Sequence, residues 1–191
     1  MAAAHGPNRN NSSGHTRPSP LHGIVNASVI ALGILLAGGV LLTASCWGGG
    51  VVSRAARILL IVGAAGSVMV GLVPEDVNPS LHVLGAFAGI VAGSCGFVLA
   101  GLIGRSSPLG RLRPVTLPLS ILAVTAAVLL FTSGIPAGDF GAVERLAVFP
   151  LRSWMVIAGI LLLREAAQDA GTGPASRRAT RCLGRMPSCR G

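Results

Sequence analysis

The side chains in this sequence that could bind a ligand or move a proton are few, and they fall next to the ends of apolar stretches. The candidate binding residues are Asn26, Glu75, Asp76, His82, Glu144, Arg145 and Arg152. Arginine binds phosphate and carboxylate groups through several parallel hydrogen bonds, and histidine beside a carboxylate can act as a base or a metal ligand. These residue types predict a shallow polar site that binds a lipid headgroup or a similar anion, mainly through Arg145, Arg152 and His82.

Two other readings of the same residues stay open. The polar groups could cap helices, pair with one another and reach the membrane interface without binding anything. A metal site could combine His82 with Asp76, Glu75 and His22, but the sequence has no HxxxH or HExxH spacing, so we expect neither a metal nor a cofactor. The four cysteines, two in apolar stretches and two in the tail, do not form a zinc pattern.

Five apolar stretches must position these residues. Of the 191 residues, 51% are hydrophobic and only 11% are charged, and the mean hydropathy is +0.71, which excludes an ordinary soluble domain. Each stretch approaches the roughly 20 residues that a helix needs to cross a bilayer. They cover residues 23–46, 56–73, 81–104, 115–132 and 146–163. The sequence therefore predicts an all-α, polytopic transmembrane bundle of about five helices.

Spacing within the stretches adds detail. Small residues recur every four positions, as in Gly85, Gly89 and Gly93, which predicts close helix packing rather than a pore lining. Ser80 is the expected N-cap of the third helix. The fifth stretch contains Pro150 and Arg152. An arginine about two turns inside a span costs about 2.5 kcal/mol or more unless it is paired, and Glu75, Asp76 or Glu144 could be the partner.

The arginines predict an orientation. All 15 basic residues are Arg, which together with abundant Ala, Gly and Val suggests a bacterial protein. With five spans, eleven of them fall on one side and four on the other, so the positive-inside rule predicts an outer N-terminus and a cytoplasmic C-terminus in the cell membrane. We expect a disordered tail at 1–20, the bundle at 21–166 and an Arg-rich cytoplasmic tail at 167–191. We expect no nucleic-acid partner, because the arginines lie in short connections and in the tail, where the positive-inside rule places them.

Three segments resemble a known family. The runs LHGIVNASVIALGILLAGGVLL, GLVPEDVNPSLHVLGAFAGIVAG and GAVERLAVFPLRSWMVIAGILLL are similar to a bacterial integral-membrane family called domain of unknown function 998. The resemblance covers most of residues 21–164, and its most specific part is the PED…LH segment. It implies a membrane bundle and no established activity. It also implies a further helix ahead of HGIVNAS, and we expect this chain to lack that first span.

The polar clustering leads to a first hypothesis of a non-enzymatic membrane protein whose extracytoplasmic residues bind membrane lipids or a membrane protein partner. The alternative is a membrane hydrolase or transferase acting on envelope lipids, with His82 and an acidic neighbour as base or metal ligands. A transporter ranks last, because Arg152 is the one charge that lies well away from the ends of a predicted span.

Overall fold

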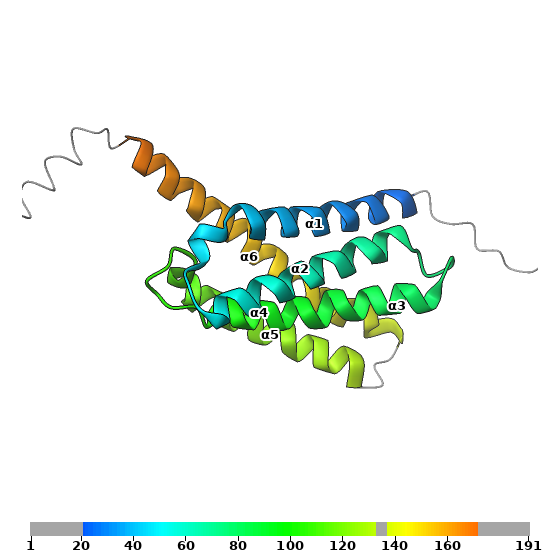
Figure 1. Ribbon diagram of the computed structural model, residues 1–191. Helices are drawn as coiled ribbons and strands as arrows, with labels where there is room; N and C mark the ends of the chain where they lie inside the picture. Colours follow the sequence, from blue (N-terminus) through cyan, green and yellow to red (C-terminus); the bar gives the residue numbers. More distant parts are fainter. Residues whose placement is uncertain (1–20, 133–136, 172–191) are drawn as a thin grey trace, which may run out of the picture.

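The fold is a bundle of long helices with short connections (Figure 1). The structure is a computed structural model and describes residues 21–132 and 137–171. The tail predicted at 1–20 and most of the tail predicted at 167–191 lie outside these residues. The helices are α1 (His22–Leu42), α2 (Val51–Leu72), α3 (Pro79–Phe87), α4 (Gly93–Gly101), α5 (Arg113–Thr132) and α6 (Ala137–Gly171). A π-helical turn, η2 (Ala88–Ala92), joins α3 and α4, and two 3-10 turns, η1 (Ala44–Trp47) and η3 (Leu109–Leu112), precede α2 and α5.

The prediction of an all-α bundle with about five spans is confirmed. Because α3, η2 and α4 follow one another without a break, they form a single long helix. Within the two described ranges, five helices are long and apolar enough to cross a membrane. The described ranges contain no strand. The fifth span departs most from its predicted limits: α6 has 35 residues and passes through Pro150. Proline is tolerated inside membrane helices when neighbouring groups satisfy the freed carbonyl.

The start of the third span corrects the predicted cap. Asn78, not Ser80, is the N-cap, and its side-chain oxygen accepts a hydrogen bond from the Leu81 amide at 3.1 Å. Pro79 occupies the first helical position, where its missing N–H costs nothing. The segment NPS therefore starts the helix two residues earlier than expected.

Glycines let α2 lie close to both of its neighbours. A Cβ atom on Gly33 of α1 would lie 2.7 Å from the Ala64 carbonyl oxygen of α2, and one on Gly63 of α2 would lie 2.8 Å from the Gly93 backbone. Side chains could not occupy these positions without moving the helices apart. The interpretation of the small-residue stripes as packing surfaces is confirmed at these contacts.

Aromatic residues fix α6 against the other helices. The Trp154 indole N–H donates a hydrogen bond of 2.8 Å to Thr116 Oγ1 on α5. Its ring also meets Trp47 edge-on at 6.2 Å and Phe97 at 5.4 Å between centroids. All four side chains are buried. These contacts join α4, α5, α6 and the η1 turn, and they fix the rotation of α6 about its axis.

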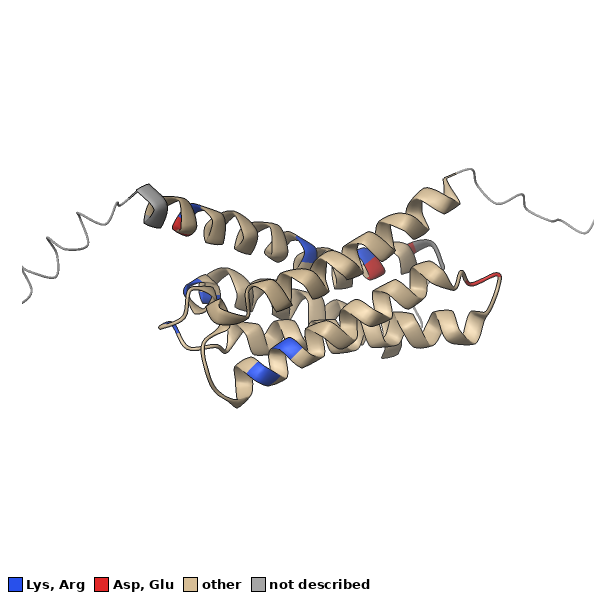
Figure 2. Ribbon diagram, turned by 45° about the horizontal axis from the view of Figure 1, so that its top comes forward, with Lys and Arg blue, Asp and Glu red and all other residues tan. Residues whose placement is uncertain are grey.

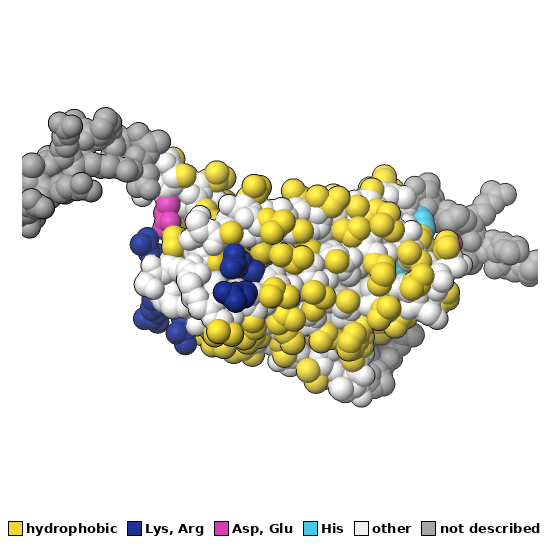
Figure 3. Space-filling model, in the orientation of Figure 1, with side chains coloured by type: hydrophobic (Ala, Val, Ile, Leu, Met, Phe, Trp, Pro, Cys, Tyr) yellow, Lys and Arg dark blue, Asp and Glu magenta, His cyan; other side chains and the backbone are white. Residues whose placement is uncertain are grey.

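Charge separates along the length of the bundle, whose sides are apolar (Figures 2 and 3). We call one end the arginine end; its residues are Arg54, Arg57, Arg105, Arg111, Arg113 and Arg164, and the acidic Glu165, which pairs with Arg111, lies there too. We call the other the acidic end; its residues are Glu75, Asp76, Asp139 and Glu144. Many large apolar side chains on the intervening surface are exposed, among them Leu35, Val62 and Val156. This distribution matches a helical bundle whose sides face lipid.

Two glycines of α1 give a matched test of the packing. Gly33→Ala places a methyl group against the α2 backbone, whereas Gly38→Ala meets no atom within 4 Å. Overpacking of this kind costs about 1–3 kcal/mol, so Gly33→Ala should lower the unfolding midpoint in detergent by roughly 2–10 °C. Gly38→Ala should leave it unchanged or raise it slightly. Equal midpoints for the two variants would contradict the close α1–α2 contact.

Candidate functional site

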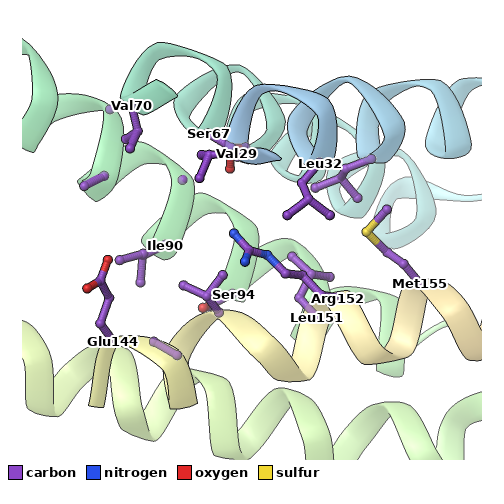
Figure 4. A pocket seen from close by; sticks show the side chains of 17 residues that line it. Val29, Leu32, Ser67, Val70, Ile90, Ser94, Glu144, Leu151, Arg152 and Met155 are labelled. Atoms are coloured by element: carbon purple, nitrogen blue, oxygen red, sulfur yellow. The ribbon is translucent and has the colours of Figure 1, made fainter. Parts of the chain in front are cut away.

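The pocket that contains predicted site residues has a volume of about 120 Å³ and lies between the helices rather than at the rim of the bundle (Figure 4). Its walls come from α1, α2, α6 and the long third span. Most of the lining is apolar, as with Val29 and Leu32 of α1. The polar side chains in it are few and come from different helices: Ser67, Ser94, Glu144 and Arg152. An apolar pocket with a few convergent polar groups is the usual form of a small-ligand site.

Helical periodicity brings Glu144 and Arg152 into this pocket together. They are eight residues apart, close to two whole turns, and Val148 and Met155 line the pocket from the same face of α6. The buried Trp154 anchors a different face of the helix. The rotation set by Trp154 therefore directs Arg152 into the pocket.

The Arg152 guanidinium has no hydrogen-bond acceptor within the part of the chain that the structure describes. Its one close aromatic neighbour is Phe149, whose ring centroid lies 6.0 Å from the guanidinium carbon. The side chain is partly buried, and Figure 4 shows it turned along the pocket toward the Glu144 side. A guanidinium has five N–H donors, so these donors remain available to an anion in the pocket.

Glu144 attracts Arg152 through space without forming a salt bridge with it. A coulombic interaction joins the two side chains, but the ion pair among the described residues is a different one, between Arg111 and Glu165 at 2.9 Å. Of the three acids considered as partners for Arg152, Glu144 is the one that lines the pocket. The two charges therefore face one pocket with space between them.

Ser94 adds a second hydrogen-bonding group that the sequence did not reveal. It is only 5% exposed and lines the pocket, and its hydroxyl forms no hydrogen bond among residues 21–132 and 137–171. Ser67, by contrast, donates to the Gly63 carbonyl of its own helix at 3.2 Å. A serine in an apolar span is a weak signal, because small residues there usually serve helix packing, and Ser94 directly follows Gly93 of such a stripe.

The π-helical turn forms part of the same wall. Gly89 and Ile90 of η2 line the pocket, one turn from Ser94. Such turns are rare and are often found at functional sites, because the extra residue changes where the following side chains point. The irregularity in the third span therefore coincides with the candidate site.

The other predicted residues lie away from this pocket. His82 Nδ1 is 2.9 Å from the carbonyl oxygen of Val73, the C-cap of α2. A carbonyl can only accept, so Nδ1 carries the proton, and the ring joins the two ends of the α2–α3 connection. Glu75 and Asp76 are exposed in this connection. Asn26 lies on α1, and its backbone carbonyl oxygen lies against Gly71 of α2.

Arg145 is exposed on α6 and does not line the pocket. Of the seven predicted residues, the structure thus places Glu144 and Arg152 in the pocket, and the other five do not line it: Asn26, Glu75, Asp76, His82 and Arg145. Among the described residues, no group of three His, Cys, Asp or Glu side chains is placed to hold a metal ion.

Fold and pocket together define a multi-pass helical membrane protein with a charged pocket inside the bundle. A family model described as "Protein of unknown function (DUF998)" matches residues 7–161, so the chain belongs to this family. No curated protein matches the sequence. No solved structure matches it either.

The His82 hydrogen bond gives a test that separates structure from binding. His82→Ala leaves the Val73 carbonyl without its donor, which should cost about 1 kcal/mol of stability. His82→Asn, whose amide can also donate, should recover part of that loss. The midpoint of unfolding in detergent and the amount of bound lipid are measured together. An Ala variant that unfolds normally but no longer binds lipid would assign His82 to the ligand site instead.

Proposed function

We propose that this protein binds a membrane lipid through its headgroup phosphate, with Arg152 as the main ligand, and that it does so without catalysing a reaction. The observation that carries the proposal is the Arg152 guanidinium, which enters an apolar pocket and has no hydrogen-bond acceptor among the described residues. A lipid is the anion most available at that depth, because the pocket lies between helices whose outer surfaces are apolar.

The guanidinium without a hydrogen-bond acceptor supports a ligand that carries an anionic group. An unpaired arginine inside a span is costly, and the coulombic attraction to Glu144 is not accompanied by direct hydrogen bonds. A phosphate oxygen at the guanidinium would form charge-assisted hydrogen bonds, which are roughly twice as strong as neutral ones. The Ser94 hydroxyl is a further donor on the opposite wall.

Two α6 arginines supply a matched test. The purified full chain is titrated with phospholipid and bound lipid is counted by native mass spectrometry. Arg152→Gln should weaken binding about 10- to 100-fold, which corresponds to about 1.5–3 kcal/mol for hydrogen bonds to a charged group. Arg145→Gln removes the same charge outside the pocket and should leave binding unchanged.

Soluble phosphate distinguishes a lipid from a free anion. Inorganic phosphate and glycerol 3-phosphate are added at millimolar concentration to the lipid-bound protein. If a lipid is the ligand, neither displaces it, because neither has an apolar chain. Equal lipid binding by the wild type and by both arginine variants would contradict the proposal.

We also propose that the acidic end faces the outside of the cell and the arginine end the cytoplasm. The support is the positive-inside rule applied to the arginines, which gather at one end of the bundle (Figure 2).

Cysteine labelling tests this orientation. In a chain whose own cysteines are replaced by serine, Asp76→Cys in the α2–α3 connection should react with a membrane-impermeant maleimide on intact cells. Ser106→Cys, exposed at the arginine end, should react only after the membrane is permeabilised. The reverse pattern would invert the orientation and leave the pocket proposal intact.

A further inference from the structure

The two charges of the pocket lie in a fixed order along α6. Glu144 is close to the acidic end, and Arg152 lies eight residues deeper, about 12 Å along the helix axis. The Arg152 guanidinium is turned back toward Glu144 (Figure 4), which shortens the separation between the charged groups. A ligand between them would meet a negative charge first and a positive charge deeper in the bundle.

An apolar space continues from the deep end of the pocket. A second cavity of about 90 Å³ lies between α1 and α6, and Leu36 and Met155 line both cavities. Gly39 of α1 and Gly159 of α6 line it, and a Cβ atom on either would meet no atom within 4 Å. Unlike the glycines that pack against α2, these two leave the seam between α1 and α6 open.

The lining of this seam fits a hydrocarbon chain. Its other lining residues include Val40, Ala158 and Leu162, and no ionisable side chain lines it. Both cavities are smaller than the roughly 300–1,000 Å³ of a pocket that encloses a drug-sized ligand. Each can therefore hold one part of an amphiphile whose remainder lies in the bilayer.

We propose that the ligand is an amine-bearing phospholipid of the phosphatidylethanolamine class, with its ammonium at Glu144, its phosphate at Arg152 and Ser94, and one acyl chain along the α1–α6 seam. In such a lipid the amine, the phosphate and the chains follow one another from the membrane surface inward. The carboxylate, the guanidinium and the apolar seam follow one another in the same order. This inference rests on the proposed function, because it presupposes a phosphate at Arg152.

Glu144 decides between headgroups of similar size. Phosphatidylglycerol carries the same phosphate but no positive charge, so Glu144 would face only hydroxyl groups. Phosphatidylcholine carries a positive charge but has no N–H to donate to the carboxylate. An exposed ion pair contributes about 0.2–1 kcal/mol, and Glu144 is exposed. The expected preference for phosphatidylethanolamine over phosphatidylglycerol is therefore about 1.4- to 5-fold.

Competition between lipids of equal chain length tests the headgroup. The full chain is reconstituted in nanodiscs with equal amounts of dioleoyl phosphatidylethanolamine and dioleoyl phosphatidylglycerol, and the bound lipids are quantified by native mass spectrometry. The wild type should prefer the amine-bearing lipid by about 1.4- to 5-fold. Glu144→Gln should lower the binding of phosphatidylethanolamine to the level of phosphatidylglycerol. Arg152→Gln should reduce the binding of both lipids.

Two neighbouring glycines of α1 test the chain. Gly39→Leu fills the open seam, whereas Gly38→Leu adds the same side chain where the cavity is not lined. Gly39→Leu should lower the occupancy of both lipids several-fold without changing their ratio, and Gly38→Leu should have no effect. Light scattering on the same samples follows the oligomeric state.

The outcomes separate this inference from the proposed function. Normal lipid binding by Arg152→Gln would overturn both. Loss of binding in Arg152→Gln together with equal affinity for the two headgroups, or with a preference that survives Glu144→Gln, would overturn the amine-bearing lipid alone. A dimer that Gly39→Leu converts to a monomer would show that a second copy, not an acyl chain, occupies the seam, and would overturn the chain placement.

Discussion

The position of α6 depends on one buried tryptophan. Because α6 packs extensively only on α5, its rotation is set largely by the Trp154 hydrogen bond to Thr116 and by the ring contacts with Trp47 and Phe97. In lipid there is little hydrophobic drive between helices, so polar and aromatic contacts of this kind have a large share in their association. The same rotation directs Arg152 into the pocket. Structure and candidate site therefore depend on the same residue.

Glycine has two opposite roles in this bundle. On the α2 contacts it removes a side chain so that two backbones can approach, as at Gly33 and Gly63. In the α1–α6 seam the missing side chain leaves an unfilled cavity, as at Gly39 and Gly159. Close approach fixes three helices into a rigid group, and the open seam lies where that group meets α6. The pocket thus results from uneven packing along α1, which is tight toward α2 and loose toward α6.

The sequence predicts the spans well and the site in part. Long apolar stretches identify all five spans. The predicted ends of the helices are wrong where a side-chain cap sets the start, as at Asn78, and where the helix continues beyond its apolar part, as in α6. The spacing of Glu144 and Arg152 was readable, because eight residues bring two side chains onto one helix face. The role of Ser94 was not readable, because small residues along a span do not reveal which helix face borders a pocket. The absence of a first span in this chain stays a prediction.

The direction of the Arg152 side chain bears most on whether the pocket serves a ligand. An arginine that only reduced the cost of its own burial would extend along the lipid-facing side of its helix to the membrane interface, where water and headgroups solvate it. Arg152 instead enters the pocket, between α1 and the Ser94 wall of the third span (Figure 4). Because Glu144 lies on the same side and forms no salt bridge with it, the space between them suits a zwitterion whose phosphate lies at the guanidinium and whose positive charge lies at the carboxylate. A solely structural role would explain an arginine paired directly with that carboxylate. It does not explain two facing charges that leave room between them.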